Sequence, residues 1–180
     1  MGLPGSQWRI QELVEEHYPN LYRYAYRLTG SAADAEDLTQ DTFCKAQSQL
    51  GQLRQAERVK PWLYSILRNA YLHRVRSRQQ QRCVSLDQVG DLPEAPADPL
   101  PEVEPERLQQ ALAELDEVFR TPVILYYFED FSYRDIAEQM DLPIGTVMSR
   151  LARAKAYLRS RLLPAAPALA DGPRRATDGL

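Results

Sequence analysis

Basic side chains in this sequence gather in two blocks that contain no acidic residue. The first block covers residues 58–82 and the second covers residues 142–170. Guanidinium and ammonium groups at such density bind nucleic-acid phosphates, so each block is a candidate nucleic-acid surface. A solvated charged face is the alternative for either block taken alone. The basic residues are Arg58, Lys60, Arg68, Arg74, Arg76, Arg78 and Arg82, and then Arg150, Arg153, Lys155, Arg159 and Arg161.

The overall charge hides this distribution. The chain has 180 residues, with 22 Lys and Arg against 25 Asp and Glu, and its formal net charge is -3. That value alone argues against a nucleic-acid partner. Between the two blocks, however, residues 87–117 are strongly acidic and include Arg107 as their only basic residue. The sequence therefore predicts two basic modules separated by an acidic segment.

Acidic residues stand close together at Asp34, Glu36 and Asp37, where acid–base catalysis has to be considered. They lie at the start of a predicted helix, with no nucleophile, metal-ligand set or phosphate-binding loop nearby. Cys44 and Cys83 lack metal-ligand spacing and are interpreted as reduced thiols of a cytoplasmic protein. The sequence thus predicts no enzyme activity, no metal, no cofactor and no small-molecule substrate.

Apolar residues recur at helical spacing through most of the chain, and no segment shows a convincing strand alternation. Pro19 predicts the end of a first helix, and a second helix then runs to Gly30. Ser31 is a candidate N-cap for a third helix that reaches about Leu50. Pro61 fits the first turn of a fourth helix. The predicted apolar stripe of this fourth helix is Trp62, Ile66, Tyr71 and Val75.

Helical spacing is lost over residues 83–105, where five prolines alternate with acids. This composition predicts a flexible acidic linker. Helix resumes at residue 106, and Thr121 with Pro122 predicts a cap followed by proline at the first position of a further helix. The predicted fold is all-α, with two small helical domains at residues 8–82 and 106–163, the linker at 83–105 and a disordered tail at 164–180.

Membrane and export signals are not expected. No stretch approaches the ~20 apolar residues that a membrane-spanning helix needs. The first ten residues do not show a basic run followed by an apolar core, which is the pattern of a signal peptide. The sequence therefore predicts a cytoplasmic protein that is not itself inserted in a membrane.

A helix-turn-helix is predicted within the second domain. Ser132 and Asp135 have the spacing of a capping box, which starts a short helix. Pro143 lacks an amide proton and restricts the residue before it, so that helix ends there and a basic helix opens near Gly145. This order is typical of the DNA-binding motif whose second helix enters the major groove, whereas a charged αα-hairpin is the alternative. The residues predicted to face inward are Ile136, Ala137 and Met140, and then Val147, Leu151, Ala154 and Leu158.

The opposite face of the basic helix is the predicted reading face. Met148, Ser149, Ala152 and Arg153 project together because they lie one and four positions apart. Arg153 can read guanine with two hydrogen bonds, and Ser149 can contact a base or a phosphate. Thr146, Arg150 and Lys155 are better placed for backbone phosphates or internal ion pairs.

Four motifs occur in one order along the chain: DAEDLTQDTF at 34–43, PWLYSILRN at 61–69, FSYRDIA at 131–137 and GTVMSRL at 145–151. Together they resemble the extracytoplasmic-function (group 4) sigma factors of the sigma-70 family, over about residues 10–163. The resemblance implies a sigma2-like helical bundle joined to a sigma4-like helix-turn-helix domain. It implies a subunit that binds core RNA polymerase, recognises minus-thirty-five and minus-ten promoter elements, and helps to melt the latter.

The resemblance also implies partners and residue roles. The acidic helix corresponds to the surface that binds the clamp helices of the polymerase β′ subunit, and the second domain corresponds to one that sits on the β flap. Asn69 matches a position that contacts a specific base, and the loop at 53–58 matches one that captures a flipped base. Promoter DNA and an anti-sigma factor are the other implied partners.

The residues implied for each surface are as follows. Core polymerase binding is assigned to Asp34, Glu36, Asp37, Gln40 and Asp41. Minus-ten binding is assigned to Leu53, Arg54, Arg58, Lys60, Arg68, Asn69, His73, Arg74 and Arg76. Minus-thirty-five binding is assigned to Thr146, Met148, Ser149, Arg150, Ala152, Arg153 and Lys155.

Three positions depart from the family pattern. Leu53 replaces a common aromatic, and Met148 and Ala152 replace residues that are often basic or larger. Fewer direct contacts with bases are therefore expected here.

Two rival interpretations of the function remain open. One is a stand-alone helix-turn-helix regulator, which would usually dimerise. The other is a sigma mimic, which would tend to lose its basic DNA-facing residues.

Overall fold

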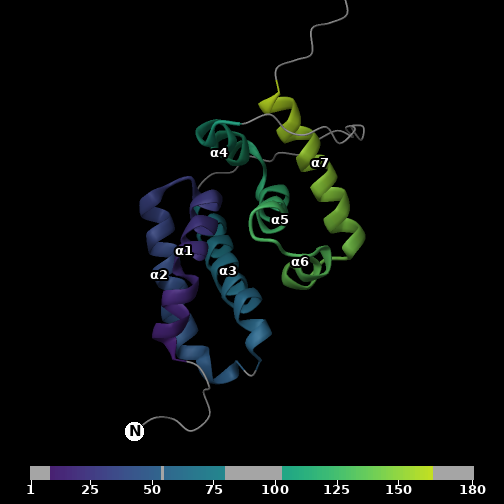
Figure 1. Ribbon diagram of the computed structural model, residues 1–180. Coiled ribbons are helices and arrows are strands. Elements are labelled where there is room, and N and C mark those ends of the chain that lie inside the picture. The colour runs from purple at the N-terminus through teal and green to yellow at the C-terminus, as the bar shows by residue number, and fades with distance from the viewer. Residues whose placement is uncertain (1–8, 54, 80–102, 164–180) are drawn as a thin grey trace, which may run out of the picture.

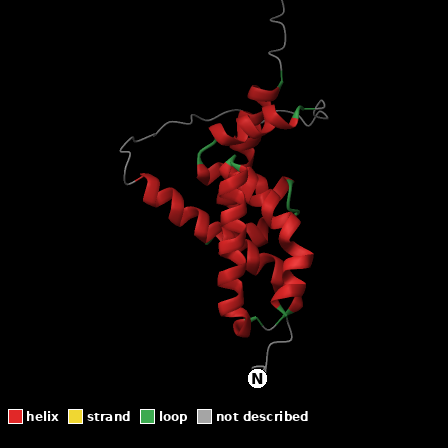
Figure 2. Ribbon diagram, turned by 90° about the vertical axis from the view of Figure 1, so that its left-hand side faces the viewer, coloured by secondary structure: helices red, strands yellow, loops and turns green. Residues whose placement is uncertain are grey.

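The computed structural model describes residues 9–53, 55–79 and 103–163, and every regular element within these ranges is a helix (Figures 1 and 2). This confirms the all-α prediction. The elements are α1 (Ile10–Thr29), α2 (Ala32–Gln49), the short 3-10 turns η1 (Leu50–Gln52) and η2 (Ala56–Arg58), α3 (Val59–Gln79), α4 (Pro105–Glu114), α5 (Glu117–Tyr127), α6 (Tyr133–Met140) and α7 (Ile144–Leu162).

Helices α1, α2 and α3 form the first bundle. The turn between α1 and α2 is set locally, because Gly30 takes a left-handed φ of 69° and the Ser31 hydroxyl accepts a hydrogen bond from the Asp34 amide at 3.3 Å. This confirms Ser31 as the N-cap. The buried side chains that join the three helices include Leu21, Tyr24, Leu28, Ala35, Leu38, Leu63 and Leu67.

Pro19 and Pro122 lie inside helices, although the sequence predicted a helix boundary at each of them. Helix α1 continues through Pro19, so the prediction of two helices there was wrong. Helix α5 begins at Glu117 with Asp116 as its N-cap, so the prediction that Pro122 opens this helix was also wrong. Pro122 removes the amide that would bond the Val118 carbonyl, and that carbonyl accepts instead from the Arg150 guanidinium at 3.5 Å. Tertiary contacts thus override the local preference of proline.

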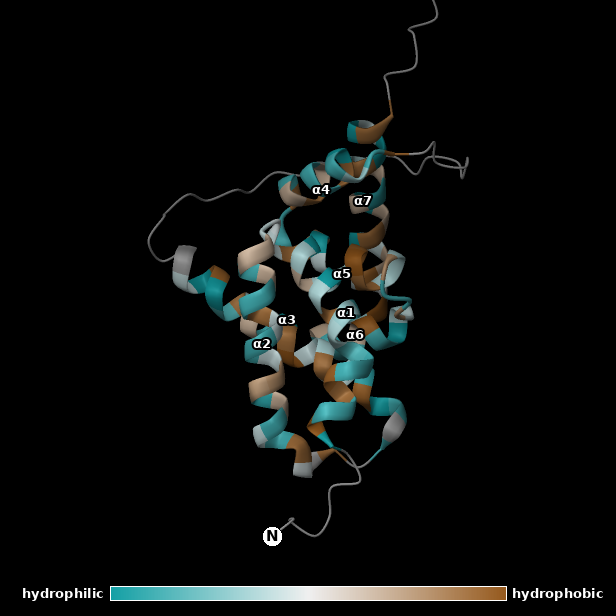
Figure 3. Cartoon of the chain, turned by 60° about the vertical axis from the view of Figure 1, so that its left-hand side comes forward, coloured by the Kyte–Doolittle hydropathy of each residue, from teal (hydrophilic) through white to brown (hydrophobic). Residues whose placement is uncertain are grey.

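Helices α4 to α7 form the second bundle, in which α7 packs against α4, α5 and α6. The predicted inward-facing residues Ile136, Val147 and Leu151 are buried in it, as are Ala137, Met140 and Ala154. Leu158 is half-buried. In Figure 3 hydrophobic and hydrophilic stretches alternate along the helices, as expected where each helix packs on one face only.

The two bundles contact each other. Helix α1 packs against α4 and α5, and α3 packs against α6. The centroid of the Phe131 ring, from the second bundle, lies 5.1 Å from that of Tyr64 on α3. Buried residues of both bundles therefore belong to one continuous hydrophobic cluster.

Some predictions fall on other parts of the chain. All but the last three residues of the predicted linker (83–105), the predicted tail (164–180), Arg54 and Cys83 lie outside the described residues, and the domain boundaries stay predictions. Cys44 is an exposed free thiol on α2. Among the described helices, none is long and apolar enough to cross a membrane.

Candidate nucleic-acid interface

The helix-turn-helix is built from local hydrogen bonds that the sequence encodes. The Ser132 hydroxyl accepts from the Asp135 amide at 3.2 Å, and the Asp135 carboxylate accepts from the Ser132 amide at 3.1 Å. The predicted capping box is thereby confirmed at the start of α6. At the other end, Asp141 takes a left-handed φ of 53°, and its amide donates to the carbonyls of Ala137 and Glu138. Pro143 is the N-cap of α7.

The predicted reading face of α7 points to solvent. Met148, Ser149, Ala152 and Arg153 are all exposed, and Met148 retains 51% of its accessible surface. Methionine side chains are usually buried in protein interiors. The Met148 side chain is instead accessible to a binding partner. The Ser149 hydroxyl donates to the Thr146 carbonyl at 3.0 Å, which leaves its oxygen able to accept.

The remaining α7 residues of the prediction differ in their surroundings. Lys155 is exposed, whereas Thr146 and Arg150 are half-buried. Because Arg150 reaches the Val118 carbonyl on α5, it helps to hold α5 against α7. The alternative of an internal role, which the sequence left open for Arg150, is the one that this contact supports.

The acidic residues of α2 lie on its solvent face. Glu36, Asp37, Gln40 and Asp41 are exposed and Asp34 is half-buried, while Ala35, Leu38, Thr39, Thr42 and Phe43 face the core. The Gln40 amide donates to the Glu36 carboxylate at 3.4 Å. This face is an exposed acidic strip on a rigid helix. Asp41 also forms an ion pair with Arg74 of α3. The resemblance assigns Asp41 to core polymerase and Arg74 to the minus-ten element, so residues of these two surfaces contact each other.

The basic residues of the first bundle lie along α3 and the turn before it. Asn69, His73 and Arg76 are exposed, and so is Arg58, but Lys60 and Arg68 are half-buried. Leu53 is 8% exposed and belongs to the core cluster. Trp62 is half-buried rather than fully in the core, and the deepest residues of α3 are Leu63 and Leu67.

Three of these cations contact the second bundle, which sequence reasoning did not foresee. Arg58 forms an ion pair with Glu138 of α6, with 2.7 Å between nitrogen and oxygen. Lys60 donates to the Glu129 carbonyl at 2.5 Å, and Arg68 donates to the Gln139 carbonyl at 3.1 Å. The structure therefore joins the basic surface of α3 to the first helix of the helix-turn-helix.

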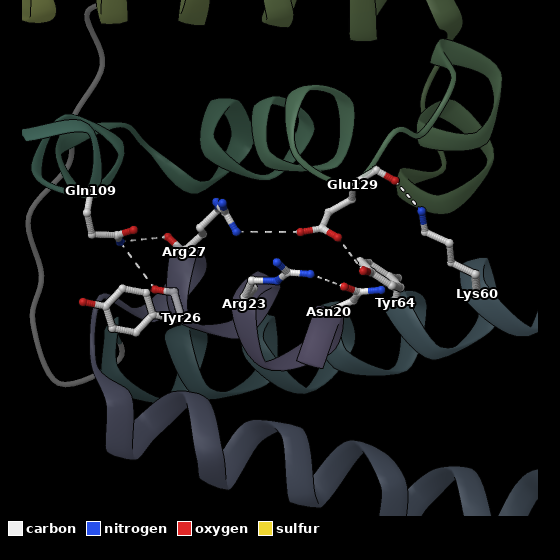
Figure 4. Close-up of polar contacts among 8 residues, drawn as sticks. All are labelled: Asn20, Arg23, Tyr26, Arg27, Lys60, Tyr64, Gln109 and Glu129. Atoms are coloured by element: carbon white, nitrogen blue, oxygen red, sulfur yellow. Dashed lines mark hydrogen bonds and ion pairs between the residues drawn. The ribbon is translucent and has the colours of Figure 1, made fainter. Parts of the chain in front are cut away.

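Glu129 is the buried centre of this contact, in the turn between α5 and α6. It is 6% exposed, its carboxylate accepts from the Tyr64 hydroxyl at 2.5 Å, and Arg27 lies 4.0 Å away (Figure 4). Burial raises the pKa of the Glu129 carboxyl, and the hydrogen bond from Tyr64 and the charge of Arg27 act in the opposite direction. Burial and the contact with Glu129 raise the pKa of Tyr64.

A second set of interbundle contacts surrounds Arg120 of α5. Its guanidinium donates to the Leu28 carbonyl of α1 at 2.9 Å and to the Tyr71 hydroxyl of α3 at 3.3 Å. It also donates to the carbonyls of Ala113 and Leu115 at 2.7 and 2.6 Å. Sequence reasoning missed Arg27, Tyr64, Arg120 and Glu129, because no local pattern distinguishes them from ordinary surface or core residues.

A cavity of about 730 Å³ opens where the bundles meet, and the ion-paired Arg58 and Glu138 both line it. Leu53 and Trp62 line it from the first bundle, and Glu138 lines it from α6. Its wall thus includes the loop that the resemblance assigns to base capture. Among the described residues, no cluster of His, Cys, Asp and Glu could hold a metal ion.

Comparisons with known proteins match both bundles. Residues 13–81 match the model of Sigma-70 region 2, and residues 106–158 match that of Sigma-70 region 4. The chain is similar to the ECF RNA polymerase sigma factor SigE of Mycolicibacterium smegmatis, with 39% identity over 158 residues, 84% of this chain and 60% of the relative. The chain therefore spans less than two thirds of that relative. It is 30% identical to the ECF RNA polymerase sigma factor SigM of Bacillus subtilis over 84% of this chain and 93% of the relative.

Solved structures share the fold. The sigma factor RpoE in complex with the anti-sigma factor NepR from Bartonella quintana has 29% sequence identity and a TM-score of 0.68, over 84% of this chain and 94% of that one. CnrH in complex with the cytosolic domain of CnrY has 23% identity and a TM-score of 0.58, over 84% and 85% of the two chains, which is a likeness of fold alone.

Proposed function

The chain belongs to the extracytoplasmic-function sigma factors of the sigma-70 family, and from this premise we propose how its surfaces direct transcription. As an alternative sigma factor it directs RNA polymerase to specific promoters. The observation that carries the finer proposal is that one chain presents an exposed acidic strip on α2, a basic α3 and an exposed reading face on α7. We assign these to core polymerase, the minus-ten element and the minus-thirty-five element, respectively.

Core polymerase docks on the acidic strip of α2. Asp37 and Glu36 are exposed on a helix whose other face is fixed by the core, so the strip is preformed and loses little freedom on binding. The partner surface is the clamp helices of the β′ subunit. Asp34 and Asp41 belong to the same strip but already have contacts within the chain, so we expect Asp37 to be the more sensitive position.

The minus-thirty-five element is read by α7, while the second bundle rests on the β flap. Arg153 supplies bidentate hydrogen bonds to guanine, and Ser149, whose proton is donated to the Thr146 carbonyl, supplies an acceptor. Met148 and Ala152 make apolar contacts, such as those with a thymine methyl group, in place of further hydrogen bonds. Lys155 neutralises backbone phosphate and therefore contributes affinity rather than sequence preference.

The minus-ten element is held in its melted form by α3 and the loop before it. Arg58, Lys60 and Arg68 bind the phosphates of the single strand, and Asn69 contacts a base. Removing a base from the stack costs a few kcal/mol, which contacts in a pocket and phosphate pairing offset. The cavity beside Leu53 is the candidate place for that base.

The other proposals follow from the family. One structural relative, the sigma factor RpoE from Bartonella quintana, is bound to the anti-sigma factor NepR, and we propose an anti-sigma factor as a partner of this chain. We also propose that it acts in the cytoplasm, where core polymerase is found, and that it has no catalytic activity of its own.

Run-off transcription of fragmented genomic DNA tests the proposal. Core polymerase with this protein should yield new, discrete transcripts that are absent with core alone. The variants Asp37→Arg and Arg153→Ala should abolish them, for loss of docking and of minus-thirty-five reading, respectively. Glu15→Arg on α1 and Arg107→Ala on α4 are matched controls, because both residues are exposed and lie off the three assigned surfaces.

A different result would select the rival function. If core polymerase gains no initiation and the protein alone retards duplex DNA, a stand-alone helix-turn-helix regulator becomes the correct interpretation. Such a regulator would also be expected to form dimers.

A further inference from the structure

We propose that α7 reads thymine through an apolar ridge made by Ile144, Met148 and Ala152, in which Ile144 is a further specificity-determining residue. The group that the ridge recognises is the 5-methyl group of thymine, which lies in the major groove. Ile144 stands just before the GTVMSRL motif, so no sequence pattern singled it out. The proposal rests on the proposed function, since it uses the assignment of α7 to the minus-thirty-five element.

The ridge follows from the helical period. Its three residues lie four positions apart, so they share one side of α7 over about 12 Å. Ile144 and Met148 retain 47% and 51% of their accessible surface, and Ala152 is also exposed. Single exposed apolar residues are common in proteins, but two large ones in succession on one side form a patch that indicates a contact. The core of the second bundle does not need them, because Val147 and Leu151 fill it from the other side of α7.

The charge of α7 indicates which kind of partner covers the ridge. The helix carries five Arg and Lys residues and no acidic residue. Ser149 and Arg153 are exposed beside the ridge, each one position after a ridge residue. An apolar strip within a polar, cationic surface matches the major groove, where the thymine methyl is an apolar group among polar base edges and anionic phosphates. The ridge is therefore assigned to duplex DNA.

The turn before α7 places Ile144 where base edges are read. The Pro143 carbonyl accepts from the amides of Thr146 and Val147 at 2.9 and 3.2 Å, which fixes the first turn with Ile144 at its first position. The N-terminal residues of the second helix are those that contact bases in a helix-turn-helix. Gly145 has no side chain, and its surroundings are open, so a base can approach Ile144 from that side. At about 3.4 Å per base pair, a ridge of about 12 Å covers three or four base pairs.

Replacement of single thymines by deoxyuridine tests the ridge, because it removes the 5-methyl group and leaves the hydrogen-bonding groups of the base. The DNA is a duplex minus-thirty-five site from a promoter that the run-off assay reveals, and binding of the polymerase holoenzyme is measured. At least one replacement should weaken binding of the wild type about fourfold, the factor expected for the burial of one methyl-sized group. The same replacement should have no further effect in Ile144→Ala or in Met148→Ala, whichever variant lacks the contacting side chain.

The Ile144 variants separate an apolar contact from a phosphate contact. On the unmodified site, Ile144→Ala should weaken binding roughly three- to tenfold, and Ile144→Leu should retain most of the affinity, since the transfer of apolar surface is largely kept. The salt dependence should stay unchanged in both, because neither removes a cation that displaces counterions. Val118→Ala on α5 is the matched control: its side chain is branched, apolar and 40% exposed, and it should leave binding and deoxyuridine sensitivity unchanged.

Three results would overturn the reading of thymine by the ridge. The first is wild-type binding that no deoxyuridine replacement weakens. The second is a deoxyuridine effect of equal size in the wild type, Ile144→Ala and Met148→Ala. The third is an Ile144→Ala variant that loses affinity for core polymerase without DNA, which would assign the ridge to a protein contact. Folding does not confuse these results, because Ile144 and Met148 are exposed and alanine favours the helix.

Failure of the proposed function gives a different result. If the wild type supports no initiation by core polymerase, the assignment of α7 to a minus-thirty-five element is refuted. The ridge is then judged on duplexes that the protein alone selects from a random pool, with the same deoxyuridine replacements. A protein that selects no duplex would refute both proposals.

Discussion

Replacement of Arg120 by alanine is the sharpest test of how the two bundles are held together. The guanidinium donates to four acceptors: the Leu28 and Ala113 carbonyls, the Leu115 carbonyl and the Tyr71 hydroxyl. The first bundle supplies Leu28 and Tyr71, and the second supplies the other two. A single side chain thus ties α1 and α3 to α4 and α5.

The expected loss can be bounded from these bonds. A hydrogen bond from a charged donor is worth about 1.5–3 kcal/mol, but four bonds to one guanidinium are not additive, and the desolvation of Arg120 itself offsets part of the gain. We therefore expect Arg120→Ala to lower the free energy of unfolding by about 3 kcal/mol. For a chain of this size that corresponds to a decrease in Tm of roughly 6–12 °C. Arg120→Lys should lose about half as much, because an ammonium lacks the planar fork of donors.

Urea unfolding followed by circular dichroism measures the effect. The wild type should unfold in one transition, and Arg120→Ala should separate into two, because the bundles no longer stabilise each other. Arg107→Ala, at an exposed position of the same bundle, should change stability by less than about 0.5 kcal/mol. A loss below about 1 kcal/mol for Arg120→Ala, within a single transition, would refute the view that Arg120 couples the bundles.

Three further predictions concern acidity, capping and DNA. Burial raises the pKa of Glu129 above its ordinary 4.5, so its contribution to the free energy of unfolding is fully present below that value and is lost as pH rises through the raised pKa; over this window the free energy of unfolding, measured in urea, should fall more in the wild type than in Glu129→Gln. Ser132→Ala removes the capping box of α6 and should cost about 1 kcal/mol in urea unfolding, whereas Ser48→Ala, at an exposed helix position, should cost less than half of that; equal losses would contradict the capping role. Arg153→Ala should weaken binding of polymerase holoenzyme to a duplex minus-thirty-five site by about 1–3 kcal/mol and relax base preference, while Lys155→Ala should weaken binding to all sequences alike and reduce the salt slope by about 1; the reverse pattern would exchange their roles.

The sequence by itself determined the features that depend on neighbours along the chain. The capping box of Ser132 and Asp135 and the buried stripe of Val147, Leu151 and Ala154 are fixed by spacings of three and four residues, which the helix converts directly into hydrogen bonds and faces. The exposed acids of α2 follow from the same periodicity. The all-α fold and the family were therefore readable from the order of local patterns.

Tertiary structure alone decided what depends on partners far along the chain. Pro19 lies inside α1 and Pro122 inside α5, because packing of the flanking residues outweighs one lost hydrogen bond in each helix. From the sequence, a glutamate in a turn such as Glu129 is expected to be exposed. It is instead buried against Tyr64, which is 65 residues earlier in the sequence. The sequence positions of Arg58 and Glu138 do not predict their ion pair, because the two residues meet only when the two bundles pack together. Local patterns specify helices and faces, and only the docking of those faces brings the basic surface of α3 against α6.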